Sequence, residues 1–332
     1  MKRILLILSM VTAVFAVAIA QEKPQLKFNP DSTFKILQLT DIHYKYGKGG
    51  SKRALECINA TLDAEKPDYV IITGDLVYEN KVRQAIDEMT QPIRDRKIPF
   101  SVVFGNHDHQ FDQSKSETYD QIEAMPYSVL PPRGNVDSPD YALEILDIQG
   151  NRPAAILYCI DSRSSYRLKK ISRYEWITRE QQNWYSDLSD KYTKQNNGKP
   201  LHSLMFFHIP TPEWEYAEAD TKNILVGSKG EGIGCPHLNS GLFTTVHAQG
   251  DVNGIFCGHD HDNDFAVGYK NILLAYGRYS GGNTVYNHLK PSGARIIVLK
   301  QDKNDFDTWI RLADGKVIHK VNFPGDFYKG KK

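Results

Sequence analysis

A strong net charge is missing from this chain, whose 332 residues include 41 lysine and arginine residues and 40 aspartate and glutamate residues. A protein that binds nucleic acid in bulk carries a clear excess of positive charge, so the balance argues against that class and disfavours a nuclease. Internal repeats and low-complexity tracts are missing too, so nothing in the sequence indicates a repeat architecture. With 40% hydrophobic and 24% charged residues, the composition is that of an ordinary globular protein with one sizeable α/β domain.

Cysteine is scarce, with four residues at Cys57, Cys159, Cys235 and Cys257. Four cysteines in an oxidising compartment permit disulfides in three full pairings, and the spacing favours none of them. Cys159 and Cys257 lie within apolar runs, where we expect small buried side chains rather than disulfide partners.

The chain has a single long hydrophobic run, from Ile4 to Ile19, which follows two basic residues and ends in the small-x-small sequence Ala18-Ile19-Ala20. Together these features are typical of a secretory signal peptide at residues 1–20. An uncleaved membrane anchor is the alternative, because the run is at the short edge of what spans a bilayer. We expect an exported protein, periplasmic or secreted, that begins near Gln21 and is not stably inserted in a membrane. Cleavage after residue 20 would remove Lys2 and Arg3 and no acidic residue. The remaining 39 basic and 40 acidic residues give a formal charge of −1.

Short apolar runs alternate with segments of helical periodicity from residue 34 onward. Apolar runs typical of buried strands cover residues 34–40, 69–73 and 100–104. Segments with apolar side chains at helical spacing lie between them, at residues 51–65 and 82–96. This alternation predicts an α/β fold with a largely parallel sheet. We expect one domain over residues 34–325, preceded by a linker at residues 21–33.

The second half of the chain adds a hairpin and a capped helix. Residues 141–148 and 154–160 flank a polar turn sequence and predict a β-hairpin. Thr178, with Gln181 three residues later, is a capping-box sequence that predicts a helix to about Tyr192. Two irregular, proline- or glycine-rich stretches, residues 108–140 and 210–241, are expected to form loops beside a functional site.

Five strand-like runs end at side chains that bind metal ions through oxygen or imidazole nitrogen. In open α/β sheets, sites form in the crevice beyond the carboxyl ends of the strands, so we expect these side chains to converge. The five motifs are Asp41-Ile42-His43, Gly74-Asp75, Gly105-Asn106-His107-Asp108, His208 and Gly258-His259-Asp260-His261.

In this order the motifs DxH, GD, GNHD, H and GHxH resemble the calcineurin-like metallophosphoesterase superfamily, which includes the purple acid phosphatases. Residues 206–210 and the loop at residues 230–241 resemble a branch of fungal and plant proteins labelled as purple acid phosphatase-like. The resemblance implies an αββα sandwich of two mixed sheets flanked by helices. It also implies a hydrolase with two metal ions, and mixed nitrogen and oxygen ligands suit manganese, iron or zinc.

The resemblance also assigns roles to individual residues. It implies that Asp41, His43, Asp75 and His261 hold the first metal ion, and that Asp75, Asn106, His208 and His259 hold the second. In this scheme Asp75 bridges the ions, and a hydroxide shared by them attacks a phosphomonoester. His107 has the family position of a histidine that assists the leaving oxygen, and Asp108 either orients His107 or is structural.

Three further side chains outside this ligand set have possible roles at the site. Tyr78 matches the GDxxY pattern in which purple acid phosphatases bind ferric iron, but those enzymes typically carry DxG at the first motif, where this chain has His43. We therefore expect His43 to be the ligand and Tyr78 to pack nearby. Arg163 and Arg278 are candidates to bind substrate phosphate, because arginine pairs with phosphate through two hydrogen bonds.

The predicted function is therefore hydrolysis of a small phosphorylated substrate, a phosphomonoester. A phosphodiesterase of the same fold is the alternative, and a catalytically inactive phosphate-binding or interaction protein is the alternative from a different class. The sequence predicts no nucleic-acid partner and no particular oligomeric state.

Overall fold

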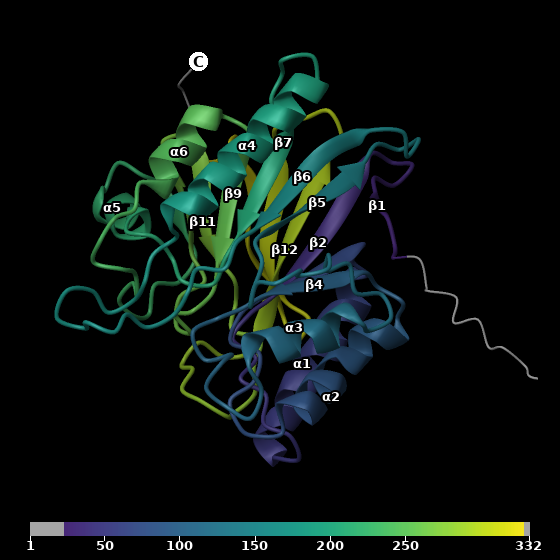
Figure 1. The fold of residues 1–332 in the computed structure, drawn as a ribbon, viewed down its shortest axis with the longest axis vertical. Coiled ribbons are helices and arrows are strands. Elements are labelled where there is room, and N and C mark those ends of the chain that lie inside the picture. The colour runs from purple at the N-terminus through teal and green to yellow at the C-terminus, as the bar shows by residue number, and fades with distance from the viewer. Residues whose placement is uncertain (1–22, 329–332) are drawn as a thin grey trace, which may run out of the picture.

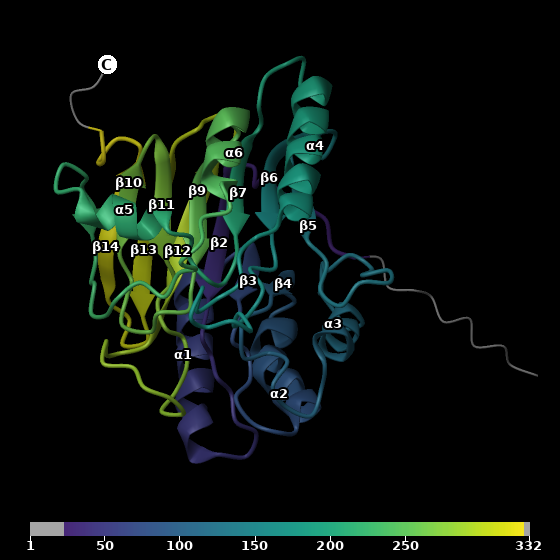
Figure 2. The same ribbon diagram turned by 60° about the vertical axis from the view of Figure 1, so that its left-hand side comes forward.

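The computed structural model describes residues 23–328, which form two β-sheets packed face to face with helices on their outer sides. In Figures 1 and 2, helices α1 and α2 lie on one side of the sandwich, and helices α4 and α6 cover the sheet on the other side. The prediction of an αββα sandwich of two mixed sheets is confirmed.

The first sheet has the strand order β14-β13-β12-β2-β3-β4. Its parallel half is β2 (Thr33–Leu39), β3 (Tyr69–Thr73) and β4 (Phe100–Val103), joined by helices α1 (Gly49–Glu65) and α2 (Val82–Asp95). Its antiparallel half is β12 (Gly293–Lys300), β13 (Phe306–Leu312) and β14 (Val317–Phe323). The sheet is mixed because short connections join the last three strands, whereas helical crossovers join the first three.

The second sheet has the order β1-β5-β6-β7-β9-β11-β10-β8. Its parallel centre is β6 (Pro153–Cys159), β7 (His202–Phe206), β9 (Val252–Cys257) and β11 (Ile272–Tyr276). Its outer strands are β1 (Leu26–Lys27), β5 (Tyr141–Leu146), β8 (Leu225–Val226) and β10 (Ala266–Tyr269). The remaining helices are α3 (Lys115–Glu123), α4 (Arg179–Gln195), α5 (Glu213–Ala219) and α6 (Leu242–Gln249).

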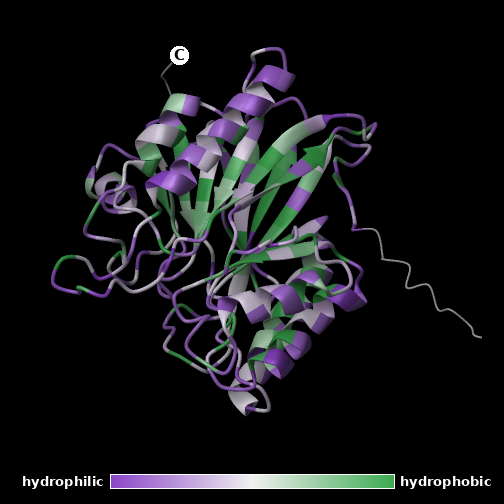
Figure 3. Cartoon of the chain, in the orientation of Figure 1, coloured by the Kyte–Doolittle hydropathy of each residue, from purple (hydrophilic) through white to green (hydrophobic). Residues whose placement is uncertain are grey.

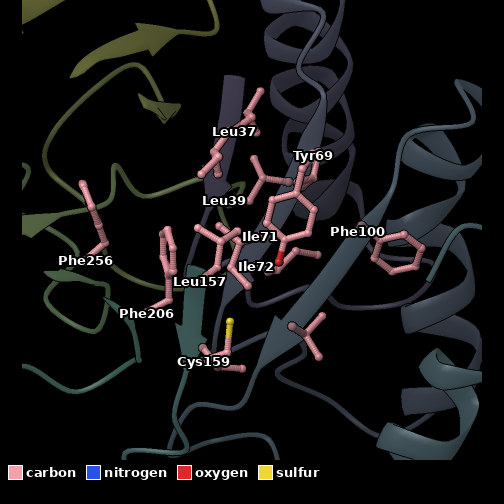
Figure 4. Packing of buried hydrophobic residues seen from close by; sticks show 14 of the residues in the cluster. Leu37, Leu39, Tyr69, Ile71, Ile72, Phe100, Leu157, Cys159, Phe206 and Phe256 are labelled. Carbon is pink, nitrogen blue, oxygen red and sulfur yellow. The ribbon is translucent and has the colours of Figure 1, made fainter. Parts of the chain in front are cut away.

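The main hydrophobic core lies between the two sheets. Figure 4 shows Leu39 and Ile72 of the first sheet near Leu157, Phe206 and Phe256 of the second, and all five are fully buried. A second cluster packs the outer side of the second sheet against its helices. The hydropathy colouring in Figure 3 follows this layering, with hydrophobic strands inside and hydrophilic helix faces outside. The sandwich is therefore a rigid base for the loops at the strand ends.

Several predicted elements are confirmed and others were missed. The hairpin of β5 and β6 is present, and Thr178 accepts a hydrogen bond from the Gln181 N–H and donates its own N–H to the Gln181 side chain. The stretches expected to be irregular contain α3, α5 and β8. The expected linker contains β1, which pairs with β5, so part of it belongs to the sheet.

All four cysteines lie in the described part of the chain and are free and buried. Cys159 and Cys257 are in β6 and β9, as expected. The predicted signal peptide lies outside the described residues. Within residues 23–328, no helix combines the length and the apolar composition needed to cross a bilayer.

Candidate metal centre

The five ligand motifs lie at the ends of β2, β3, β4, β7 and β9, which belong to both sheets. Two clusters of side chains form where these ends meet. In each cluster every residue offers one possible ligand atom, and these atoms lie within 4.8 Å of one another. The first cluster is Asp41, His43, Asp75 and His261, and the second is Asp75, His208 and His259. The structure thus brings together side chains that are up to 220 positions apart in the sequence.

The first cluster is tightly packed and buried. His43 Nε2 lies 3.0 Å from His261 Nε2 and 3.5 Å from Asp75 Oδ2. His261 Nε2 lies 3.6 Å from Asp41 Oδ1. Two imidazole nitrogens and two carboxylates therefore converge on one point, which is the donor set of a bound cation.

The second cluster shares Asp75 with the first. His208 Nε2 lies 3.3 Å from Asp75 Oδ2, and His259 Nδ1 lies 3.3 Å from His208 Nε2. Asn106 lines the same pocket, and its buried Oδ1 has no hydrogen-bond partner among the described residues. Because Asp75 belongs to both clusters, it would be a ligand shared by two bound ions.

The hydrogen bonds around the imidazoles fix which nitrogen faces the cluster. His208 Nδ1 lies 2.7 Å from the carbonyl oxygen of Thr73, and His261 Nδ1 lies 2.8 Å from that of Tyr286. A carbonyl accepts the Nδ1 proton, so the Nε2 lone pair of each ring points to the cluster. Together with the unpartnered Asn106 oxygen, this arrangement fits a site for two metal ions.

Four ligand residues have an unusual backbone. The φ angles of Asp41, His43, Asp75 and His259 are 53°, 45°, 52° and 82°, which lie in the left-handed region. Non-glycine residues persist there only where surrounding contacts hold them, and such residues gather at functional sites. Two of these contacts are backbone hydrogen bonds, from Asp41 N to Gly74 O at 3.1 Å and from His43 N to Asp75 O at 3.0 Å.

Gly74 is required by the approach of His208. Its φ is +86°, and a Cβ at this position would lie 2.5 Å from His208 Nδ1. Any larger residue would push the second cluster apart, which explains why a glycine precedes Asp75.

Burial and neighbouring charges oppose each other at the shared carboxylate. Burial acts to raise the pKa of Asp75, but His208, His43 and His107 outweigh it and hold that pKa well below its usual value. Burial likewise acts to lower the pKa of His208, but Asp75 and Asp41 raise it to about 10. The centre therefore stabilises positive charge, which a metal ion supplies when it displaces the histidine proton.

Asp108 does not orient His107, contrary to one of the two expected roles. Its carboxylate accepts hydrogen bonds from the N–H groups of Asp75, Leu76 and Gly105 at 3.0, 2.7 and 2.8 Å. Burial raises the pKa of Asp108 to about 6. Its place in the structure is that of an anchor for the loop that carries Asp75.

Gln110 takes the place beside His107 that was expected for Asp108. The Nδ1 atom of His107 lies 2.7 Å from Oε1 of Gln110, and the His107 N–H donates to Asp75 Oδ1 at 2.9 Å. Sequence reasoning missed Gln110, because no pattern indicates which residue of a turn contacts an adjacent histidine.

A pocket of about 350 Å³ opens above the two clusters. Its lining includes His107 and four side chains that sequence reasoning did not assign to substrate binding, Arg173, Tyr174, Glu231 and Tyr286. Arg173 comes from an irregular segment without periodicity, so no local pattern indicated it. Glu231 belongs to the loop at residues 210–241 that was expected beside the site, whereas no sequence pattern indicated Tyr286.

The two arginines expected to bind phosphate lie elsewhere. Arg278 is 3% exposed and donates to Asp264 Oδ2 at 2.6 Å and to the Pro291 carbonyl at 2.8 Å. Because the Arg278 guanidinium is buried and already paired with these two groups, it is not placed to bind substrate phosphate. Arg163 lines a separate cavity of about 1020 Å³, together with His109.

Tyr78 packs beside the first cluster. Its ring contacts those of His43 and His107 edge-on, with centroids 5.1 and 4.9 Å apart, and Lys45 Nζ lies 5.1 Å from the Tyr78 centroid. The arrangement is that of a packing neighbour of His43.

The sequence of residues 34–263 matches the calcineurin-like phosphoesterase family. The chain belongs to this family, and its fold and paired ligand clusters are those of a metallophosphoesterase. It is 31% identical to the Arabidopsis thaliana protein named "Probable inactive purple acid phosphatase 29", over 88% of this chain and 86% of that protein. It is 29% identical to "Phosphatase DCR2" of Saccharomyces cerevisiae, over 87% of this chain and 55% of that protein.

Solved structures share the fold. A dimetal phosphatase from Danio rerio superposes with a TM-score of 0.58 at 11% identity, over 87% of this chain and 98% of that one. The purple acid phosphatase PPD1 from yellow lupin superposes with a TM-score of 0.51 at 12% identity, over 88% of this chain and 54% of that one.

Proposed function

We propose that the protein is a phosphatase that hydrolyses phosphomonoesters at a dinuclear metal centre. The observation that carries the proposal is that Asp75 belongs to both ligand clusters directly beneath an open pocket. Two ions held by these residues would lower the pKa of a bound water and would stabilise the charge on the transferring phosphoryl group. The protein supplies the ligands, the shape of the pocket and the proton transfers.

His107 is proposed to protonate the leaving oxygen. Gln110 accepts its Nδ1 proton, which leaves Nε2 to exchange a proton with substrate. The backbone N–H of His107 donates to Asp75 Oδ1, so the backbone of His107 is held beside the shared ligand. A group positioned in this way contributes roughly 10² to 10⁴ in rate.

Arg173 is proposed to hold the substrate phosphate. Its guanidinium lies 5.2 Å from the centroid of Tyr174, and the Tyr174 ring packs edge-on against His259 at 4.6 Å. The stacking orients the guanidinium beside the second cluster, where a phosphate can accept two parallel hydrogen bonds.

Glu231 is proposed to select against leaving groups that carry further negative charge. Its carboxylate accepts hydrogen bonds from the Tyr286 hydroxyl at 3.0 Å and from the Asp262 N–H at 2.8 Å. A fixed carboxylate at the pocket wall repels a second phosphate, so monoesters of neutral or hydroxylated leaving groups are favoured over pyrophosphates.

The second candidate is a phosphate-binding protein without catalysis. The names of relatives that include the word "inactive" favour it. The presence of both ligand clusters and of His107 in this chain supports the catalytic proposal instead.

The test is a metal-reconstituted assay of the purified protein against phosphomonoesters, phosphodiesters and pyrophosphate. The proposal expects the highest kcat/KM for monoesters and the lowest for pyrophosphate. Preference for diesters would favour the phosphodiesterase, and tight phosphate binding without turnover of any ester would favour the inactive protein.

A further inference from the structure

The segment between β6 and α4 forms a small hairpin that projects from the body of the molecule. Its two arms pair through a bridge between Ser165 and Tyr174 and a hydrogen bond from Tyr166 N to Arg173 O at 3.1 Å. A turn bonded from Ile171 N to Leu168 O closes it. We call residues 163–173 the basic hairpin; it belongs to the teal loop at the lower left of Figure 1.

The base of the basic hairpin is fixed to the site. The Ser172 hydroxyl donates to the Tyr174 carbonyl at 2.6 Å and accepts from the His237 N–H at 3.0 Å. Arg173 and Tyr174 at this base line the catalytic pocket. A molecule or surface bound at the hairpin tip therefore lies near the pocket.

Positive charge is concentrated in this segment although the whole chain is nearly neutral. The basic hairpin contains no acidic residue. Its five basic residues are Arg163, Arg167, Lys169, Lys170 and Arg173. Arg167, Lys169 and Lys170 at the tip are exposed, and within residues 23–328 none of these three forms an ion pair. The tip thus presents cations that no carboxylate of the described residues neutralises.

Aliphatic side chains lie between these cations. Leu168 is 41% exposed and Ile171 is 49% exposed, in a turn of only four residues. Figure 3 shows hydrophobic and hydrophilic residues side by side along this loop. Aliphatic groups flanked by lysine and arginine suit the boundary of a bilayer, where the cations meet lipid phosphates and the apolar groups enter the acyl region.

We propose that the basic hairpin docks the protein on the surface of an anionic lipid membrane. A nucleic-acid site fits the tip less well, because single-stranded nucleic acid is bound by stacking on exposed aromatic rings. The aromatic residue of the hairpin, Tyr166, packs instead against Trp176, with ring centroids 5.2 Å apart. Docking does not depend on the proposed catalysis, and it brings the pocket mouth to the lipid headgroups.

The test is co-sedimentation with phosphatidylcholine vesicles that contain or lack phosphatidylserine. The chain used begins at Gln21, because it keeps every helix and strand of the described fold without the apolar N-terminal run. Wild type is expected to bind only the vesicles with phosphatidylserine. The triple variant Arg167→Gln, Lys169→Gln, Lys170→Gln is expected to bind roughly a hundredfold more weakly, since each cation near an anionic surface contributes about fivefold.

Two matched controls separate docking from general charge. The variant Lys52→Gln, Arg53→Gln, Arg83→Gln removes the same charge from exposed positions of α1 and α2 and is expected to bind like wild type. The variant Leu168→Ser, Ile171→Ser is expected to lose at least about tenfold even at high salt, where electrostatic attraction is screened. The control Ile224→Ser, Val317→Ser, also at exposed apolar positions, is expected to lose nothing.

Three outcomes would overturn the docking proposal. The first is that wild type does not bind the anionic vesicles. The second is equal loss in the two triple variants, which would mean that overall charge decides. The third is that an RNA homopolymer displaces the vesicles while Leu168→Ser, Ile171→Ser binds normally, which would identify a general polyanion site.

Hydrolysis of a soluble monoester, measured in parallel, is expected to be the same in all four variants, so a failure of catalysis is recognised separately.

Discussion

The Nδ1 atom of His107 lies 2.7 Å from Oε1 of Gln110, two residues beyond the aspartate that was expected to orient it. This contact fixes the tautomer of the histidine proposed to protonate the leaving oxygen. His107→Ala is expected to lower kcat by roughly 10² to 10⁴ while both metal ions stay bound. Gln110→Ala is expected to lower kcat by a smaller factor, about tenfold, for esters with a poor leaving group.

His109→Ala is the matched control, because His109 is two residues away and lines the neighbouring cavity instead. It is expected to keep full activity. A metal-free His107→Ala protein, or one with normal turnover of an ester with a poor leaving group, would show that the assigned role is wrong.

A substitution at Arg173 tests where substrate phosphate binds. Arg173→Gln removes the guanidinium from the pocket, so we expect kcat/KM for a monoester to fall roughly tenfold to a hundredfold and phosphate to inhibit more weakly. Arg163→Gln is expected to change neither, since Arg163 lines the other cavity. Steady-state kinetics with phosphate as inhibitor measures both effects. A larger loss of kcat/KM in Arg163→Gln than in Arg173→Gln would support the phosphate-binding role expected for Arg163 from the sequence.

The colour of the iron-loaded protein tests the competition between Tyr78 and His43. We expect no purple charge-transfer band, because the Tyr78 ring packs edge-on beside His43 rather than replacing it. Tyr78→Phe is expected to keep its metal, and His43→Ala is expected to weaken the first site. A visible band in air-oxidised wild type that disappears in Tyr78→Phe would identify tyrosinate as a ligand.

The pH dependence of stability is expected to include a contribution from Asp140. Burial raises the pKa of Asp140 to about 6, although Gln181 and the Asp161 N–H act to lower it. The folded state therefore holds this proton more tightly than the unfolded chain, so the stabilisation is complete below the unfolded pKa and is lost as pH rises through about 6. Relative to wild type, Asp140→Asn should gain up to about 3 kcal/mol in unfolding free energy between about pH 4 and about pH 7.

Denaturant unfolding of both proteins at the two pH values measures this gain. Asp187→Asn, at an exposed position of α4, is the control and is expected to follow wild type. A difference between Asp140→Asn and wild type that does not change with pH would contradict the prediction.

The ligand motifs could be recognised in the sequence because each follows an apolar strand, and sites form beyond the carboxyl ends of parallel strands. Asp41 and His261 follow strands of different sheets, β2 and β9, and the packing of the two sheets brings them together. Helix α3 also has a signal in the sequence, since Ser114 and Glu117 form a capping box at its start.

Other features depend on contacts that no local pattern encodes. Arg278 was expected in the pocket, but Asp264, which binds it, lies in a different strand connection and buries it. Arg173 enters the pocket because a hairpin of irregular sequence folds back on His237. Loop placement of this kind is decided by tertiary contacts, so the substrate side of the site could not be predicted.

The position of Asp75 in both ligand clusters is the basis of the proposed function, and metal analysis tests it most directly. Wild type and Asp75→Ala, shown by circular dichroism to be folded alike, are loaded with the same metal, and bound metal and monoester hydrolysis are measured on the same samples. We predict about two ions per chain and activity in wild type, and loss of metal and activity together in Asp75→Ala. An Asp75→Ala protein that keeps both ions and hydrolyses the ester would contradict the account.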